Sequence, residues 1–118
     1  MKTAKYKPLK KVSKPWGYEI WLALNDKYCF KQLVIHKGHR FSLQYHKIKR
    51  ETIFIESGQA NVTIDGGLIQ CNPGDVLDIT PGMEHRIEAV TDLVLYEAST
   101  PEVNDVVRIG DDYGRKGT

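Results

Sequence analysis

The sequence predicts an all-β domain that forms either an antiparallel sandwich or a closed barrel. From about residue 18 onward, short runs rich in β-branched and aromatic residues are separated by Gly, Asn, Asp and Pro. No stretch shows the 3.6-residue apolar period of a convincing helix. The length of 118 residues is that of one compact domain with a single core.

Turn residues set the boundaries of the expected strands. Asp65-Gly66 favours a hairpin of the primed type, because both residues tolerate positive φ angles. We expect a lysine-rich irregular segment at 1–13, the ordered domain at 14–115 and a short tail at 116–118. So many short strands in so short a chain must curl and close. The strands are expected at residues 18–24, 28–36, 41–46, 51–57, 59–64, 67–71, 75–79, 85–90, 92–99 and 105–109.

Composition and charge narrow the function classes. Hydrophobic residues make up 41% of the chain and charged residues 27%, as in an ordinary globular protein. The net charge is +2, and lysines crowd the first fourteen residues, which weakly indicates an anionic ligand. No recognition helix accompanies this segment, so we do not expect nucleic acid as a partner.

Cysteine usage and hydropathy indicate a cytoplasmic protein. Cys29 and Cys71 each lie inside an apolar strand-like run, where cysteine behaves as a small buried hydrophobe. No apolar segment follows the basic N-terminus, and no apolar run approaches the length that spans a membrane. We therefore expect a reduced, cytoplasmic protein with no membrane partner.

Alternation along residues 41–46 sorts polar from apolar side chains. In a strand, successive side chains point to opposite faces. Ser42, Gln44 and His46 therefore share one face of this run. Phe41, Leu43 and Tyr45 share the other face. An ordinary sandwich would bury this aromatic face and leave the polar set in water, whereas in a barrel the polar set could line a cavity while the aromatic face packs outward against a second layer.

Four potential metal ligands lie on three of the expected strands. Gln44 and His46 project from one strand, Glu51 opens the next, and His85 begins a third after the Pro81-Gly82 turn. Two imidazole nitrogens, one carboxylate and one amide oxygen suit a borderline or hard divalent metal. The sequence suggests no thiolate ligand.

The spacing of these residues resembles the two motifs of the cupin superfamily. The first motif has Gly, five residues, His-X-His, a short gap, Glu, six residues and Gly, and it matches 38–58 with Gln44 in place of the first histidine. The second, Gly-X5-Pro-X-Gly-X2-His, matches 74–85 with Thr80 in place of its first proline. The resemblance implies a single-domain cupin, a double-stranded β-helix or jelly-roll barrel. It also implies one divalent ion held by Gln44, His46, Glu51 and His85.

With Gln44 in this position, the Gln, His, Glu, His ligand set resembles that of the phosphomannose isomerases. This family includes free-standing enzymes and the C-terminal domains of bifunctional isomerase/guanylyltransferases. Residues 14–19, 42–46, 85–86, 105–108 and 112–115 also look like this family, so the similarity covers about 14–115. Two positions depart from it: Lys47 replaces a frequent further histidine, and Gly110 stands where an acidic residue is usual. The resemblance implies interconversion of mannose 6-phosphate and fructose 6-phosphate, or of a close relative, through a metal-stabilised enediolate. The ion would be Zn, Mn, Co, Ni or Fe.

Two charged residues in apolar strands are candidates for moving protons. Glu97 follows Leu93 and Leu95 at alternate positions, which predicts a buried or cavity-facing carboxylate and makes it the leading general-base candidate. A carboxylate at an exposed strand end, or one paired with arginine, is the alternative. Lys31 alternates with Leu33 and Ile35 in the same way, and its alternative is a snorkelling lysine on an edge strand.

Three arginines are candidates for binding the phosphate of a sugar phosphate. Arg86, Arg108 and Arg115 can each form bidentate hydrogen bonds with such a group. Surface ion pairs with Asp105, Asp111 and Asp112 explain them equally well.

Two other functions remain open at this point. One is a non-catalytic cupin module that binds a metal and a sugar, and the other is a nucleotide-sugar ketoisomerase. We expect a homodimer, because the exposed edge strands of a short barrel need covering.

Overall fold

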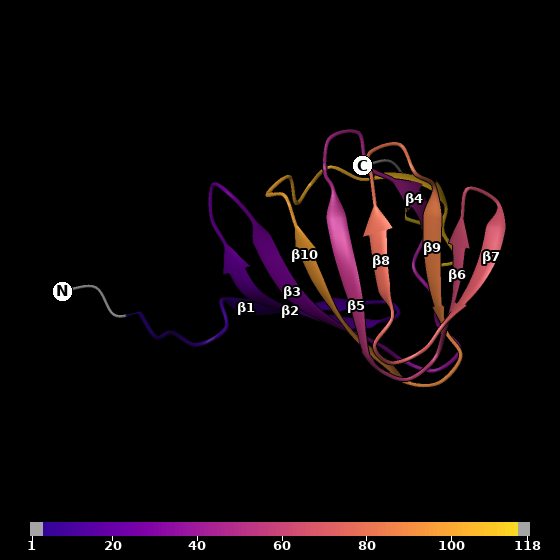
Figure 1. Cartoon of the computed structure of the whole chain (residues 1–118), viewed down its shortest axis with the longest axis horizontal. Helices are drawn as coiled ribbons and strands as arrows, with labels where there is room; N and C mark the ends of the chain where they lie inside the picture. Colours follow the sequence, from indigo (N-terminus) through magenta and orange to yellow (C-terminus); the bar gives the residue numbers. More distant parts are fainter. Residues whose placement is uncertain (1–3, 116–118) are drawn as a thin grey trace.

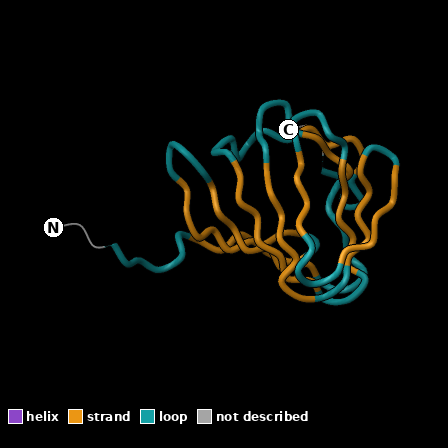
Figure 2. The backbone as a smooth tube through the Cα atoms, viewed as in Figure 1, coloured by secondary structure: helices purple, strands orange, loops and turns teal. Residues whose placement is uncertain are grey.

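The computed structural model describes residues 4–115, which form two antiparallel β-sheets (Figures 1 and 2). No helix long and apolar enough to cross a membrane occurs among these residues. All ten expected strands are present, with ends that differ by at most two residues. The strands are β1 (Lys10–Lys14), β2 (Gly17–Leu24), β3 (Cys29–Ile35), β4 (Leu43–Tyr45), β5 (Glu51–Ser57), β6 (Ala60–Ile64), β7 (Gly67–Cys71), β8 (Val76–Ile79), β9 (His85–Ala89), β10 (Leu93–Ser99) and β11 (Val107–Gly110).

The two sheets face each other and form a jelly-roll barrel, as the all-β expectation required. One sheet has the order β1-β2-β3-β10-β5-β8, and the other has the order β11-β4-β9-β6-β7. Figure 1 shows β1, β2 and β3 continuing the larger sheet to one side of the barrel, while β4, β9, β6 and β7 lie on the other side.

The inward-facing residues change from apolar to charged along the strands. In β3, Leu33 and Ile35 are buried in the core, and so are their register partners on β10. At the other end of the same two strands, Lys31 is the register partner of Glu97, and both are buried. Because β3 and β10 pair in register, these charges gather at one end of the barrel. An apolar core therefore occupies one end and a polar cavity the other.

The expectation of an irregular segment at 1–13 is wrong for residues 10–13. These residues belong to β1, which pairs with β2 in antiparallel register. Backbone hydrogen bonds hold β1 in place although most of its side chains are exposed, so alternation of hydrophobicity could not reveal it. The ammonium groups of Lys10 and Lys11 also lie over the rings of Trp21 and Tyr18, at 4.1 and 4.2 Å from the ring centroids. Residues 1–3 and the expected tail at 116–118 lie outside the described residues.

The predicted faces of 41–46 are wrong at Phe41. The strand includes only 43–45, so the alternation does not extend back to Phe41. The Phe41 side chain is buried in the core, with its ring centroid 4.5 Å from that of Trp16. Ser42 and His46 are buried as well, as expected for the polar face.

Glycine is required where two backbone segments approach closely. Gly58 has φ +87°, and a Cβ atom there would lie 2.1 Å from the carbonyl oxygen of Asp92. Asp65 and Gly66 have φ angles of 46° and 84°, which fits the primed hairpin turn expected between β6 and β7.

Candidate metal centre

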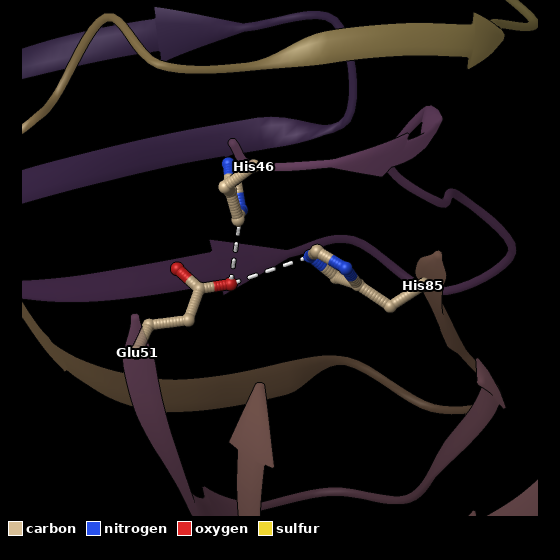
Figure 3. Close-up of side chains that lie close together, drawn as sticks. All are labelled: His46, Glu51 and His85. Carbon is tan, nitrogen blue, oxygen red and sulfur yellow. Dashed lines mark ion pairs between the residues drawn. The ribbon is translucent and has the colours of Figure 1, made fainter. Parts of the chain in front are cut away.

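Three predicted ligands meet in the interior of the barrel (Figure 3). His46 directly follows β4, Glu51 is the first residue of β5, and His85 is the first residue of β9. The Nε2 atoms of His46 and His85 lie 3.4 and 3.3 Å from the same oxygen, Oε1 of Glu51. One ligand atom from each residue lies within 4.8 Å of the others, and all three side chains are buried. The sequence thus located a cluster that folding brings together from three strands.

Hydrogen bonds fix which nitrogen of each histidine faces this cluster. His46 Nδ1 lies 2.6 Å from the carbonyl oxygen of Asp105, and His85 Nδ1 lies 2.9 Å from that of Met83. A carbonyl oxygen only accepts, so each Nδ1 carries a proton and donates it. In a neutral imidazole the opposite nitrogen, Nε2, then carries a lone pair directed at Glu51.

The cluster therefore presents acceptors with no donor between them. Both Nε2 atoms are buried without a hydrogen-bond partner among the described residues. Two lone pairs and a carboxylate facing one point repel each other unless a cation lies between them. The residues present fit a divalent metal ion. Histidines that bind a metal through one ring nitrogen usually donate a hydrogen bond from the other, as Nδ1 does in His46 and His85.

The electrostatics of the cluster point the same way. Burial by itself lowers the pKa of His46, but the carboxylate of Glu51 outweighs it and raises that pKa above its ordinary value. Burial opposes ionisation of Glu51, yet the adjacent His46 and His85 rings and the charge of Lys49 hold its pKa well below the usual range. The Glu51 carboxylate therefore stays ionised and attracts positive charge.

Gln44 lies beside this cluster on β4, between β11 and β9 of the smaller sheet. It is the register partner of His85 on one side and of Arg108 on the other, and it lines the same cavity as His46. Its Oε1 accepts a hydrogen bond from Ser42 Oγ at 2.7 Å. The side chain of Gln44 is thus near the other three predicted ligands, and its role as a fourth ligand stays a prediction.

A cavity of about 360 Å³ adjoins the cluster, and Glu97 faces it from β10. Glu97 is buried as expected, so the alternative of an exposed strand end is wrong. Its partner is a lysine and not an arginine: Lys49 Nζ lies 3.2 Å from Glu97 and 3.1 Å from Glu51. Burial and the charge of Glu51 raise the pKa of Glu97 to about 7, against the opposing charge of Lys49.

Lys49 is a residue that sequence reasoning missed. It is buried, and burial lowers its pKa less than the charges of Glu97 and Glu51 raise it, so it stays protonated. The sequence did contain a signal, because Lys49 lies two residues before Glu51 and so continues the alternation of Glu51, Ile53 and Ile55, which all point inward. The loop position of Lys49, between two expected strands, concealed this signal.

Lys31 is buried and lines the cavity, so its prediction as an inward-facing lysine is confirmed. Its strand, β3, lies between β2 and β10, which excludes the snorkelling edge-strand alternative. The ammonium lies 3.4 Å from Glu19 Oε1 and 4.0 Å from the centroid of the Trp21 ring. These contacts hold Lys31 against β2.

The three predicted arginines separate into different roles. Arg108 lines the cavity, and its Nε is buried with no hydrogen-bond partner among residues 4–115. Arg115 also lines the cavity but forms an ion pair with Asp111 at 2.9 Å. Arg86 is not a cavity residue: it donates to the carbonyl oxygens of Phe41 and Gly110 at 3.0 and 2.8 Å. Two of the guanidinium nitrogens of Arg86 thus hold the backbone away from the cavity lining, and a role for Arg86 in binding substrate stays a prediction.

A family match covers nearly the whole chain. Residues 2–111 match the family described as mannose-6-phosphate isomerase C-terminal. The chain belongs to this family. Its two-sheet domain is thus related to the C-terminal domain of mannose-6-phosphate isomerases.

Curated relatives are much longer than this chain. A mannose-1-phosphate guanylyltransferase of Escherichia coli K12 is 32% identical over 111 residues, which is 90% of this chain and 23% of the relative. The xanthan biosynthesis protein XanB of Xanthomonas campestris pv. campestris strain B100 is 28% identical over 111 residues, which is 90% of this chain and 24% of the relative. The chain spans about a quarter of the length of these relatives.

Solved structures confirm the barrel. The nucleoside dehydratase Pac13 matches with a TM-score of 0.78 and 13% identity over 92% of this chain and 93% of that chain. An RmlC-like cupin from Shewanella frigidimarina matches with a TM-score of 0.71 and 17% identity over 78% of this chain and 83% of that chain. KdgF from Halomonas sp. matches with a TM-score of 0.74 and 15% identity over 79% and 86%. At these identities the likeness is one of fold.

Proposed function

We propose that this protein is a metal-dependent aldose–ketose isomerase that interconverts mannose 6-phosphate and fructose 6-phosphate or a close relative. The observation that carries the proposal is the position of Glu97, a buried carboxyl group with a pKa of about 7 that faces a cavity beside the His46, Glu51 and His85 cluster. A group with this pKa serves as an efficient base and acid at neutral pH. The family match supplies the substrate class.

Glu97 performs the proton transfer on carbon in this proposal. As a carboxylate it takes the proton from the carbon next to the open-chain carbonyl, and as an acid it returns that proton to the neighbouring carbon. The hydroxyl proton moves between the two oxygens, so the reaction consumes nothing. Lys49 contacts Glu97 at 3.2 Å and favours its ionised form. Lys31, the register partner of Glu97, is the second candidate for moving a proton.

A divalent ion bound by His46, Glu51 and His85 supplies Lewis-acid polarisation of the substrate carbonyl. The protein's own groups keep water and stray protons away from this step, because all three ligands are buried below 4% exposure. In this proposal Gln44, the register partner of His85, would supply an amide oxygen as a fourth ligand.

Cationic side chains around the cavity bind the phosphate in this proposal. Arg108 and Arg115 line it together with Lys14, which sequence reasoning did not single out. Burial lowers the pKa of Lys14, and the neighbouring charges of Lys31, Arg115 and Arg108 lower it further, although Glu19 opposes this. Such a concentration of positive charge favours an anionic group. Phosphate bound there anchors the sugar remote from the reacting carbons.

A coupled assay tests the proposal. The protein loaded with Zn, Mn, Co, Ni or Fe is incubated with mannose 6-phosphate, and fructose 6-phosphate is measured. Turnover that Glu97→Gln lowers about 10²- to 10⁴-fold, at unchanged metal content, supports it. Binding of metal without turnover with any of these ions refutes the isomerase proposal and favours a non-catalytic module that binds metal and sugar. Turnover of nucleotide sugars alone favours a ketoisomerase.

A further inference from the structure

Asp105 makes an unusual number of contacts around the metal ligand His46. Its backbone carbonyl oxygen accepts from His46 Nδ1 at 2.6 Å. Its carboxylate accepts from three successive backbone amides, those of Lys47 at 3.0 Å, Ile48 at 2.7 Å and Lys49 at 2.8 Å. One residue of the C-terminal segment thus contacts both the ring and the loop that follows it.

The loop held by Asp105 connects two of the metal ligands. Residues 47–50 join His46 at the end of β4 to Glu51 at the start of β5, and they include Lys49, which contacts Glu51 and Glu97. The loop has no regular secondary structure, so its conformation depends on hydrogen bonds such as those to Asp105. A change in this loop alters the spacing of His46 and Glu51 together.

The carbonyl and the carboxylate of Asp105 depend on each other. Three amide hydrogen bonds fix the residue, and the fixed residue aims its carbonyl at the His46 ring. The neighbouring residues 103–106 line the cavity, so the same segment forms part of the cavity wall. Burial raises and the three amides lower the pKa of Asp105, and the amides prevail, which keeps the carboxylate ionised.

We infer that Asp105 is a positioning residue that sets the tautomer and orientation of His46 and the conformation of the loop between two metal ligands. It acts through His46 and does not touch the substrate. The inference rests on the proposed metal site but not on isomerase activity. It predicts that the C-terminal segment must be seated on the barrel before the metal site is complete.

Two readouts test this role independently of turnover. The first is the affinity for Zn²⁺ and the visible spectrum of bound Co²⁺. The second is the pair of ring ¹⁵N shifts of His46 in the metal-free protein, which distinguish a protonated from an unprotonated nitrogen. Asp105→Ala is expected to weaken Zn²⁺ binding about 10- to 100-fold, to change the Co²⁺ spectrum and to give His46 a mixture of tautomers. Asp105→Asn keeps the shape of the side chain and serves if Asp105→Ala does not fold.

Asp112→Asn is the matched control. Asp112 also attaches the C-terminal segment to the barrel, but its side chain does so by accepting from Arg40 at 2.7 and 3.0 Å and not from the loop at 47–50. Wild-type affinity and wild-type His46 shifts are expected for this variant. Unchanged His46 shifts in both Asp105 variants overturn the inference, and so does an equal loss in Asp112→Asn. If the wild type binds no metal while His46 still responds to Asp105→Ala, the positioning role stands and the metal-dependent function fails.

Discussion

Replacing Lys49 by methionine removes the lysine that forms ion pairs with two buried carboxylates. Lys49 Nζ lies 3.1 Å from Glu51 and 3.2 Å from Glu97, and all three side chains are less than 10% exposed. Removing one partner of a buried ion pair costs about 3–5 kcal/mol, because the remaining charge loses its partner without regaining water. We therefore expect the metal-free variant to lose about 3 kcal/mol of unfolding free energy at pH 6.

The loss is expected to grow with pH. Lys49 lowers the pKa of Glu97, so its removal raises that pKa above the present value of about 7. A carboxyl group whose pKa is raised by folding stabilises the folded state at low pH and loses this contribution as pH rises through the folded pKa. At pH 8 the variant is therefore expected to lose about 1 kcal/mol more than at pH 6, since one pKa unit corresponds to about 1.4 kcal/mol.

Urea unfolding in the presence of a chelator measures both quantities. Arg50→Met is the matched control, because Arg50 is adjacent but its ion pair with Asp78 lies on the surface, and little change is expected there. Adding Glu97→Gln to Lys49→Met is expected to recover part of the loss, as a double-mutant cycle would show. A Lys49→Met protein as stable as Arg50→Met at both pH values contradicts this account of the cavity.

Three further predictions concern different parts of the chain. Gly58→Ala is expected to lower the unfolding free energy by more than about 2 kcal/mol, because the new Cβ meets the backbone of Asp92. Gly74→Ala has a similar φ and no neighbour within 4 Å, so the same urea titration is expected to show a smaller loss. In the pH profile of kcat, Glu97→Gln is expected to abolish the limb that titrates near pH 7, and an unchanged profile would exclude Glu97 as the base. Sedimentation is expected to give a molar mass of about twice the 13.5 kDa of one chain, as for a homodimer. Replacing the exposed Phe54 of the larger sheet by glutamate is expected to give a monomer.

The sequence predicted the barrel and its buried ligands well. Period-2 alternation and turn residues located ten strands. The motif spacing identified His46, Glu51 and His85 as ligands of one site, and these three residues do lie together. The alternation of Glu97 with apolar residues also predicted its burial correctly. The strands and the burial of Glu97 follow from local patterns, whereas the grouping of His46, Glu51 and His85 depended on the resemblance to the two cupin motifs.

Features that depend on distant partners escaped the sequence. β1 forms because β2 supplies its backbone hydrogen bonds, which its lysine-rich sequence does not reveal. Arg86 was predicted to bind phosphate, as Arg108 was, but it donates hydrogen bonds to the carbonyl oxygens of Phe41 and Gly110. Only the fold brings these groups together. Asp105 was predicted as an ion-pair partner for an arginine, but its carboxylate accepts hydrogen bonds from the backbone amides of the loop before β5.

Metal-edge anomalous diffraction from crystals of the metal-loaded protein tests the central claim most directly. One strong peak is expected among the side chains of His46, Glu51 and His85, about 2.0–2.3 Å from both Nε2 atoms and one Glu51 oxygen. A dominant peak elsewhere, or fully loaded protein with no peak between these three residues, would contradict the claim that they form the metal centre.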